Sequence, residues 1–513
     1  MSSTVSPARA SRDIALSAAP APSGLVAVLA VAAAIVVLHL ATNGRYGFHR
    51  DELQFLSDAR NLDWGYVCYP PMTAFIERIS LGIFGLSLVG LRLLSVLFQA
   101  AAIVVTGLMT RELGGNRWAQ FTAALAVALS PLPLFEGTEF QYSSFDYLWW
   151  VLIAYFTVRL LKSENPRWWL AIGAVIGLGL ETKYSIVFYI GGLLAGMLFT
   201  SARRYFASKW FWGGVAIALV LFLPNIVWLV RHDFISYHFL QHIHARDVAE
   251  GRADGFLNDQ IRLCVNLFAA PLGLAGLIAF LQSARYRMLA WMYLVPFLFF
   301  YLDKGRSYYV AAAYPMLIAM GAVVATQWLA GWPAWGRRTL ATAFFLGLVF
   351  IGGYACTIVV PLQASGPLRD YALSHNGDLR EEIGWNELVK QVAQIRDSLP
   401  AGQQAHLGIT TGNYGEYGAV MMLGPAYGLP APIGTTNSEW LRGYPAQPPT
   451  TLIVLGLGER EANSLFTGCR LATRNGNSEG VRNEESQFHP NIFVCGPPRK
   501  PWAELWKEHR DFG

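Results

Sequence analysis

Eleven runs of apolar residues, nearly free of charge, alternate with polar segments along the first 361 residues of the chain. Because about 20 predominantly apolar residues cross the hydrocarbon core of a membrane as a helix, each run is predicted to be a transmembrane helix. The predicted spans are residues 24–42, 87–109, 118–135, 145–161, 168–182, 184–200, 211–230, 263–282, 288–302, 308–330 and 340–361. The pattern therefore predicts an α-helical polytopic membrane protein. The fifth and sixth spans are short, and only the polar step at Thr182 and Lys183 separates them.

Lys and Arg in the short loops predict how these helices are oriented, because cytoplasmic loops favour both residues. Every second loop is basic, and the segment before the first span is basic too. The residues concerned are Arg9, Arg12, Arg111, Arg117, Arg159, Lys162, Arg167, Arg203, Arg204, Lys209, Arg285, Arg287, Arg337 and Arg338. Residues 1–23 are therefore predicted to be cytoplasmic. An odd number of spans then places residues 362–513 outside, in the periplasm if the protein lies in the inner membrane of a Gram-negative bacterium.

The chain after residue 361 has a different pattern and predicts a water-soluble α/β domain. Apolar residues follow helical spacing over 381–398, and the helix is expected to end at Pro400. Short apolar runs between Gly, Pro and Asn predict strands. These runs are residues 405–410, 451–457 and 492–495. The predicted domains are thus a cytoplasmic segment (1–23), a transmembrane domain (24–361) and an outer α/β domain (362–513).

Composition and charge exclude other classes of protein. The chain is 54% hydrophobic and only 14% charged, which excludes a soluble enzyme, a disordered protein and a fibrous one. Residues 362–513 hold 13 Lys and Arg against 16 Asp and Glu, whereas the rest of the chain has a net charge of +8. The five cysteines show no CxxC or Cys/His metal spacing. Cys469 and Cys495, in the outer domain, either pair in an oxidising compartment or remain two free thiols.

Functional residues are expected in the long outer segments, which are residues 43–86, residues 231–262 and the tail, because a rigid scaffold commonly carries its site on such segments. Asp51 and Glu52 follow the first span closely enough to stand at the membrane boundary. An acidic pair is costly there unless it is used or paired. The alternative to a functional site is an ion pair of Asp51 with Arg50 or Arg45 at the interface.

A further carboxylate and several rings are predicted on the same outer side. Asp146 opens the fourth span. It either marks a functional cavity or lies there because the helix dipole stabilises an acidic residue in the first turn of a helix. Two outward acids on different helices, Asp51 and Asp146, are the minimum for positioning and deprotonating a hydroxyl group. Tyr69, Tyr142 and His232 are the expected contacts of a sugar or acceptor, although an interfacial aromatic belt also explains rings at such positions.

Cations occur in the predicted outer loops, against the positive-inside trend. Lys183 separates two short spans, Arg231 ends the seventh, and Lys304 and Arg306 lie between the ninth and tenth. A phosphate group at the membrane surface accounts for them, since Arg offers a bidentate fork and Lys a point charge. For Arg231 the alternative is contact with lipid headgroups.

Histidines are concentrated in the second outer loop. They are His232, His238, His242 and His244. His238 and His242 are four residues apart and would share one face of a helix, as zinc ligands can. No carboxylate of evident spacing accompanies them, so ordinary polar contacts are favoured and no metal centre is predicted. A divalent metal is accordingly not favoured as a cofactor.

These residues form a series of motifs that resembles the GT-C membrane glycosyltransferases of the protein O-mannosyltransferase and lipid A aminoarabinose transferase type, grouped as glycosyltransferase family 39. The matching motifs are RDEL with Asp51 and Glu52, YPPM, SFDYLWW with Asp146, GLGLETKYS with Lys183, and KGRSYYVAAAYP. The resemblance implies a GT-C fold and Asp51 as the catalytic base. It also implies that Lys183, Lys304 and Arg306 hold the phosphate of a polyprenyl-phosphate sugar. The α/β tail is unlike the MIR domains of eukaryotic members, so the acceptor is not implied.

The expected function is an inverting glycosyl transfer from a polyprenyl-phosphate sugar to a hydroxyl of a lipid, glycan or protein, with no required cofactor and no nucleic acid partner. Asp51 would take the proton of the hydroxyl, Glu52 would orient Asp51 or its loop, and Asp146 would bind the acceptor or a sugar hydroxyl. One alternative is a transporter or flippase of a lipid-linked saccharide, although such proteins tend to show internal repeats and none is seen. Another is a non-catalytic assembly protein that binds a partner through its tail.

Overall fold

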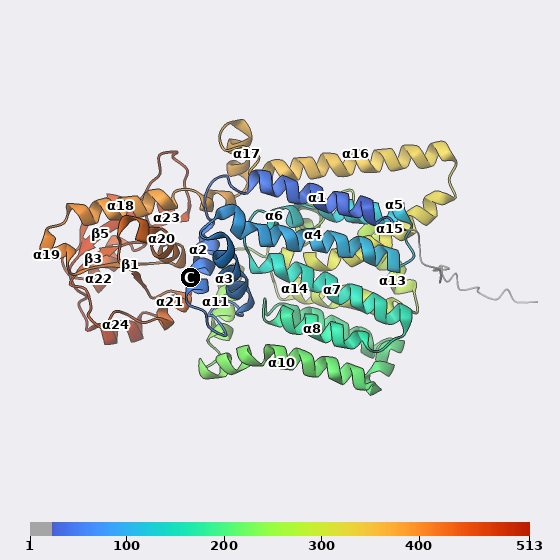
Figure 1. Cartoon of the computed structure of the whole chain (residues 1–513), viewed down its shortest axis with the longest axis horizontal. Helices are drawn as coiled ribbons and strands as arrows, with labels where there is room; N and C mark the ends of the chain where they lie inside the picture. The colour runs from blue at the N-terminus through green and yellow to red at the C-terminus, as the bar shows by residue number, and fades with distance from the viewer. Residues whose placement is uncertain (1–22) are drawn as a thin grey trace, which may run out of the picture.

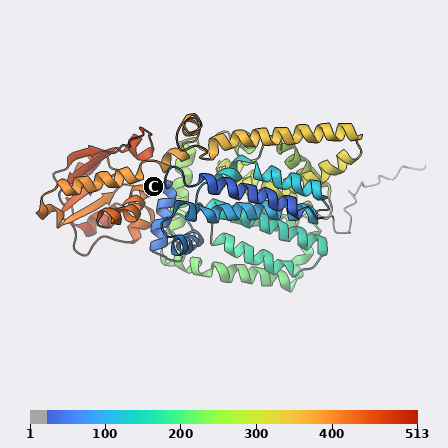
Figure 2. The same ribbon diagram turned by 45° about the horizontal axis from the view of Figure 1, so that its top comes forward.

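The computed structural model describes residues 23–513, so the predicted cytoplasmic segment lies almost wholly outside the described residues. A long bundle of helices makes up one end of the molecule, and a sheet domain makes up the other (Figure 1). Three helices from the loops of the bundle, α2 (Arg50–Arg60), α3 (Met72–Phe84) and α11 (Ile235–Ala249), lie between these two bodies. Figure 2 shows the same order from another side.

The helices of the bundle overlap all eleven predicted spans. They are α1 (Leu25–Thr42), α4 (Leu88–Glu112), α5 (Arg117–Ala128), α6 (Pro131–Glu136), α7 (Tyr142–Ser163), α8 (Trp168–Leu180), α9 (Ile186–Leu198), η1 (Ser201–Ala207), α10 (Lys209–Arg231), α12 (Phe256–Asp259), η2 (Gln260–Cys264), α13 (Ala270–Gln282), α14 (Arg287–Leu302), η3 (Ser307–Ala313), α15 (Tyr314–Ala330) and α16 (Ala334–Val359). The prediction of a polytopic helical membrane protein is therefore confirmed.

Not every predicted span is long enough to cross a membrane alone. Among the described residues, six helices are long and apolar enough: α1, α4, α7, α10, the continuous pair of η3 and α15, and α16. A seventh results if α9 and η1, which meet at an angle of 102°, are counted together. Helices α8, α13 and α14 are shorter. The predicted span 118–135 is divided into α5 and α6, because Pro131 begins a new helix at its first position, where the missing N–H costs nothing.

The C-terminal domain is an α/β domain, as predicted. Its helices are α17 (Pro367–His375), η4 (Asp378–Glu382), α18 (Trp385–Ser398), α19 (Ala401–Gln404), α20 (Tyr414–Leu423), η5 (Gly424–Tyr427), α21 (Asn437–Leu441), α22 (Glu459–Leu465), α23 (Glu484–Phe488) and α24 (Trp502–Glu508). Its strands are β1 (Leu407–Thr411), β2 (Pro432–Gly434), β3 (Thr451–Val454), β4 (Arg470–Arg474) and β5 (Asn491–Cys495), in the sheet order β2-β1-β3-β5-β4. Strand β1 pairs in parallel with β2 and β3, whereas β5 pairs antiparallel with β3 and β4.

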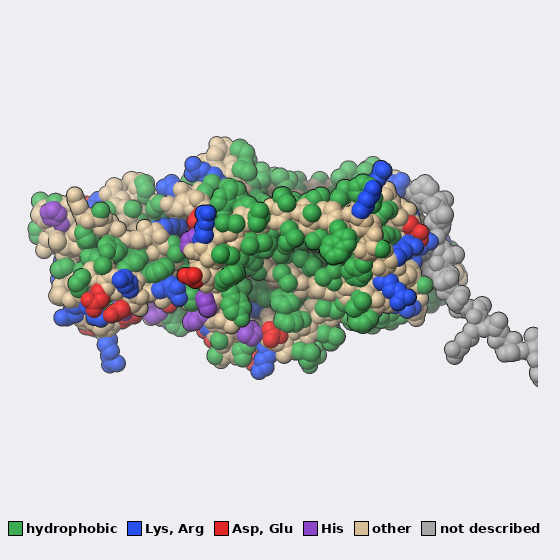
Figure 3. Space-filling model, turned by 90° about the horizontal axis from the view of Figure 1, so that it is seen from below, with side chains coloured by type: hydrophobic (Ala, Val, Ile, Leu, Met, Phe, Trp, Pro, Cys, Tyr) green, Lys and Arg blue, Asp and Glu red, His purple; other side chains and the backbone are tan. Residues whose placement is uncertain are grey.

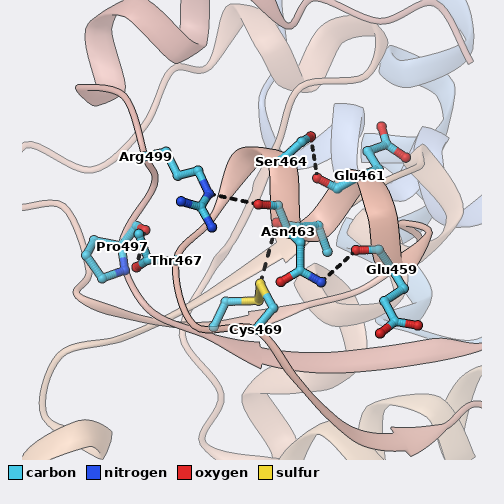
Figure 4. Close-up of a disulfide and its surroundings, with 10 residues drawn as sticks. Glu459, Glu461, Asn463, Ser464, Thr467, Cys469, Pro497 and Arg499 are labelled. Carbon is cyan, nitrogen blue, oxygen red and sulfur yellow. Dashed lines mark hydrogen bonds between the residues drawn. A yellow bond between two sulfur atoms is a disulfide. The ribbon is translucent and has the colours of Figure 1, made fainter.

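Cys469 and Cys495 form a disulfide in this domain. The bridge joins the residue before β4 to the last residue of β5, and Figure 4 shows it among Asn463, Thr467 and Arg499. Of the two alternatives that the sequence left open, the structure therefore contains the paired one. A disulfide persists in an oxidising compartment, as expected of a domain outside the cytoplasm.

Helix α2 connects the two bodies. Leu53 and Leu56 of α2 pack in one apolar cluster with Trp385 and Val389 of α18 and Ala419 of α20. The same cluster contains side chains of α3 and of the segment before α7. The helix that carries Asp51 is thus buried between the bundle and the C-terminal domain.

The surface of the bundle is consistent with a lipid environment. Figure 3 shows hydrophobic side chains over most of one face, with Lys and Arg gathered at the end far from the C-terminal domain. Contacts there join loops that were predicted to share the cytoplasmic side, such as Arg204 with Glu164, and Arg159 and Lys162 with Glu112. The basic loops therefore lie at one end of the bundle, and the predicted functional loops lie at the other.

Candidate active site

Asp51 is held by hydrogen bonds from two distant parts of the chain. It lies in the first turn of α2, and its carboxylate is partly exposed. Gln141 Nε2, just before α7, donates to Oδ2 over 2.8 Å, and the Tyr414 hydroxyl of the C-terminal domain donates to Oδ1 over 2.9 Å. Each oxygen retains a lone pair that can accept a hydrogen bond from a further hydroxyl.

The ion pair that would give Asp51 a purely structural role is not formed. Arg50 pairs instead with Glu484 and Glu485 of the C-terminal domain, and no ion pair of Asp51 occurs within residues 23–513. Arg45, another cation of this loop, donates to the backbone carbonyls of residues 361 and 362. The carboxylate of Asp51 is therefore positioned by neutral donors and is not neutralised by a cation.

Burial raises the pKa of Asp51, but opposing effects are larger. The charges of His49 and Arg50 and the hydrogen bonds from Gln141 and Tyr414 all lower it. The resulting pKa lies below the ordinary value of an aspartate, so the carboxylate is ionised at physiological pH.

Glu52 holds the loop and is not available to a substrate. Its side chain is fully buried, and its oxygens accept hydrogen bonds from Arg92 Nε and Nη2 and from the backbone N–H groups of His49 and Phe140, each over 2.8 Å. The bond to His49 completes a capping box at the start of α2. Glu52 therefore fixes the helix from which Asp51 projects.

Lys183 lies among three tyrosine rings. Its Nζ is 4.5 Å from the ring centroid of Tyr309, 5.0 Å from that of Tyr142 and 5.4 Å from that of Tyr308. Within the described part of the chain, no carboxylate lies in ion-pair distance of this ammonium group. Since Tyr142 directly follows Gln141, two consecutive residues connect the carboxylate of Asp51 with an unpaired cation.

Arg306 lies beside this group but has a protein partner. Its Nε and Nη2 donate to the two oxygens of Asp247 on α11 over 2.6 and 2.9 Å. Nη1 points to the hydroxyl of Tyr308 at 3.4 Å. Asp247 of α11 thus fixes the edge of the guanidinium that carries Nε and Nη2. The remaining nitrogen, Nη1, lies toward the rings that surround Lys183.

Asp146 lies deeper and does not act as a helix cap. Helix α7 begins at Tyr142, so Asp146 is one turn inside it, nearly buried, and accepts a hydrogen bond from Trp150 Nε1 over 3.1 Å. Lys183 and Glu136 both interact electrostatically with its carboxyl group. Asp146 is therefore part of the surroundings of Lys183.

Of the other predicted site residues, Tyr69 contacts this group through the ring of Tyr142, whereas His232, Lys304 and Arg231 have other surroundings. Tyr69 is buried and donates to Asp58 over 2.5 Å, while its ring packs on Tyr142. His232 stacks on Trp228. The side chains of Lys304 and Arg231 are exposed, and within residues 23–513 neither side chain makes a hydrogen bond or ion pair.

The histidines of the second outer loop do not converge with other ligands. Helix α11 carries His238, His242 and His244 on exposed positions. Residues 23–513 contain no group of three or more His, Cys, Asp or Glu side chains that could hold a metal ion.

Several residues of the site escaped prediction. They are Gln141, Tyr308, Tyr309, Asp247, Glu136 and Tyr414. The two adjacent tyrosines follow the Lys-Gly-Arg sequence that contains Arg306, which was a signal in the sequence, whereas Asp247 is one of five acids in residues 231–262 and nothing in the sequence distinguishes it. Tyr414 carried none, because only the docking of the C-terminal domain brings it to Asp51.

Part of the membrane body is similar to a known protein family. The family model described as dolichyl-phosphate-mannose-protein mannosyltransferase matches residues 69–228. This region contains Tyr142, Asp146 and Lys183, whereas Asp51 precedes it. The family resemblance predicted from the motifs is therefore confirmed.

Two curated relatives match about half of the chain. The lipid A galacturonosyltransferase RgtD of Rhizobium johnstonii is 30% identical over 249 residues, which is 47% of this chain and 50% of the relative. The undecaprenyl phosphate-alpha-4-amino-4-deoxy-L-arabinose arabinosyl transferase 1 of Pseudomonas fluorescens is 27% identical over 273 residues, 49% of this chain and 47% of the relative. The match thus spans about half the length of either relative.

The fold is that of ArnT from Cupriavidus metallidurans. Its crystal structure bound to undecaprenyl phosphate has a TM-score of 0.54 and 14% identity, covering 92% of this chain and 97% of that one. The structure in the apo state has a TM-score of 0.56, with the same identity and coverage. The predicted fold class is confirmed.

Proposed function

We propose that this chain is an inverting glycosyltransferase that uses a polyprenyl-phosphate sugar. The proposal is supported by the match of residues 69–228 to the mannosyltransferase family model and by the similarity of the fold to that of ArnT. The observation that carries the proposal is the arrangement of Asp51 and Lys183. Two consecutive residues, Gln141 and Tyr142, contact a carboxylate held by two neutral donors and an ammonium group that forms no ion pair with any residue of 23–513. A base for a hydroxyl and a cation for a phosphate are the two groups that this reaction requires.

The reaction is a single displacement at the anomeric carbon. Asp51 accepts the proton of the acceptor hydroxyl, whose oxygen forms a bond to the anomeric carbon while the bond to the phosphate oxygen breaks. The electron pair of that bond leaves with the polyprenyl phosphate, which needs no proton. Attack from the face opposite the phosphate inverts the configuration, and one carboxylate base suffices.

Lys183 and Arg306 stabilise the negative charge that the leaving phosphate gains. Lys183 supplies an ammonium group that has no ion-pair partner within residues 23–513, and Arg306 supplies Nη1, since Asp247 fixes Nε and Nη2. Such preorganised cations are worth most where water is partly excluded. Lys304 and Arg231, which are exposed, are proposed as additional contacts of the phosphate or of headgroups as the lipid enters.

The remaining residues have supporting roles in this proposal. Glu52 orients the loop, because its hydrogen bonds fix the start of α2. Asp146 binds a hydroxyl of the sugar or acceptor from beneath Lys183. Tyr142 offers its ring to the sugar, while Tyr69 and His232 shape the acceptor side. The proposed reaction requires no cofactor, and a divalent metal is not favoured.

The acceptor is proposed from the relatives. One is called a lipid A galacturonosyltransferase, so a lipid A hydroxyl is the first acceptor to test, ahead of surface glycan and protein. Transfer would take place on the outer face of a bacterial inner membrane, with the C-terminal domain in the periplasm. This orientation follows from the basic loops at the opposite end of the bundle.

Mass spectrometry of lipid A from cells with and without the gene tests the proposal. Lipid A is expected to lose one glycosyl residue in the deletion strain and to regain it when the gene is restored. Surface glycans and periplasmic glycoproteins are measured in parallel. If all three are unchanged, and purified protein in vesicles moves a lipid-linked sugar across the bilayer without transferring it, the chain is a transporter.

A further inference from the structure

The C-terminal domain is packed against the helix that carries Asp51. Gly418 of α20 lies directly on α2, since a Cβ at this position would overlap the backbone carbonyl of Leu53. Arg442, near α21, pairs with Asp58 at the other end of α2 and donates to Ser57 over 2.7 Å. These contacts hold α20 in one position along α2.

Tyr414, the first residue of α20, lies over the start of α2. Its hydroxyl donates to Asp51, and its ring lies under Arg50, with 4.6 Å between the guanidinium carbon and the ring centroid. Arg50 in turn pairs with Glu484 and Glu485 of the same domain. The tyrosine is therefore fixed by its own domain on one side and by α2 on the other.

We propose that Tyr414 is a positioning residue for Asp51, so that the C-terminal domain completes the catalytic centre formed by the membrane body. This inference rests on the proposed function, in which Asp51 accepts the proton of the acceptor. Tyr414 and Gln141 each occupy one lone pair of the carboxylate, from opposite domains. The lone pairs that remain on the two oxygens can accept a hydrogen bond from the acceptor hydroxyl.

The hydroxyl of Tyr414 also affects the ionisation of Asp51. The titratable, charged and hydrogen-bonding groups around this carboxylate are His49 and Arg50 at the start of α2, Cys68 before α3, Gln141 and Tyr142 at the start of α7, and Tyr414 on α20. A hydrogen bond to the ionised form of a carboxylate lowers its pKa. Loss of the Tyr414 hydroxyl therefore raises the pKa of Asp51 and loosens its geometry.

The test is the full-length Tyr414→Phe variant, which keeps the ring under Arg50 and removes only the hydroxyl. We expect kcat to fall about tenfold at pH 7 with KM for the polyprenyl-phosphate sugar unchanged. The acid limb of kcat/KM should move up by about one pH unit. Tyr417→Phe is the matched control, because Tyr417 lies on the same helix and contacts Arg442 but not Asp51.

A second measurement does not depend on turnover. Infrared titration of the Asp51 carboxyl group, assigned by difference from Asp51→Asn, should show the higher pKa in Tyr414→Phe and the wild-type pKa in Tyr417→Phe. An unchanged pKa together with unchanged kcat would overturn the positioning role. An equal loss of kcat in both variants would also overturn it, because docking alone would then explain the effect. If the wild type transfers no sugar, the proposed function fails, and the titration still decides whether Tyr414 sets the state of Asp51.

Discussion

At the scale of single residues, the site combines an ionised carboxylate with a lysine that forms no ion pair with the residues that the structure describes. Asp51 was found in the sequence because an acid next to an apolar span is costly unless it is used. Its two donors could not be found in the same way, since Gln141 and Tyr414 are ordinary polar residues whose role depends on the tertiary structure. Lys304 shows the converse. Like Lys183, it is a lysine between two predicted spans on the outer side, yet the turn that contains it leaves its side chain exposed.

This difference between the two lysines gives a prediction. Lys183→Ala should weaken binding of the lipid donor by roughly 1.5–3 kcal/mol, or about 10- to 100-fold, because a charge-assisted contact to the phosphate is lost. Lys304→Ala is the comparison, and a several-fold change at most is expected from a cation at the exposed surface. Binding of undecaprenyl phosphate to the two purified variants gives both values. Equal losses would place the phosphate nearer the exposed loop than we propose.

At the scale of elements, α2 connects the site to the rest of the molecule. The sequence predicted the helices of the bundle well, because apolar runs of that length have few alternatives in a membrane. It also predicted three strands of the C-terminal sheet. It missed β2, which has only three residues, and β4, whose sequence RLATR is too polar and exposed for a strand pattern. The docking of α20 on α2 has no local signature at all.

The close approach of Gly418 to α2 predicts the effect of a single methyl group. Gly418→Ala should separate α20 from α2 and cost about 1–3 kcal/mol of stability, since the neighbouring atom is a backbone carbonyl that cannot move aside. Transfer activity should fall with it, because Tyr414 moves with α20. Thermal unfolding and turnover of the purified variant measure the two effects. Gly402→Ala is the control, since nothing lies within 4 Å of a Cβ there, and its unfolding should match that of the wild type or occur at higher temperature.

The disulfide supports the same domain. Its cysteines are 26 residues apart, and in the chain-entropy account a loop of this size is worth about 3.5 kcal/mol. Cys469→Ser should therefore lower the unfolding temperature of the C-terminal domain, and a reducing agent should do the same to the wild type but not to the variant. Cys356→Ser, which removes a thiol outside any bridge, serves as the control. Insensitivity of the wild type to reduction would mean that the bridge contributes little to this fold.

At the scale of the whole molecule, two bodies suited to different solvents share one site. The apolar bundle and the charged C-terminal domain were distinguished by composition alone. Their junction was not, because it consists of buried carboxyl and guanidinium groups that the sequence shows only as ordinary surface charge. Glu416 and Glu439 are fully enclosed there.

These two carboxyl groups make the junction sensitive to pH. Burial raises the pKa of Glu416 and of Glu439 from 4.5 to about 8, with the charges of Glu485 and Asp58 adding to the respective shifts. Since the pKa is raised in the folded state, their stabilising effect is fully present below pH 4.5 and is lost as the pH rises to about 8. The free energy of unfolding should thus fall between pH 5 and pH 8, by up to about 1.4 kcal/mol per pH unit for each group. Glu416→Gln should flatten this slope, and an unchanged slope would contradict the assignment.

The central claim is that Asp51 accepts the proton of the acceptor in transfer from a polyprenyl-phosphate sugar. The most direct test compares turnover of purified wild type and Asp51→Asn, normalised to folded protein, with donor binding measured on the same samples. An asparagine keeps the size of the side chain but cannot take the proton. The account predicts a rate lower by about 10²- to 10⁴-fold with donor affinity retained. Turnover of the variant near that of the wild type would contradict it.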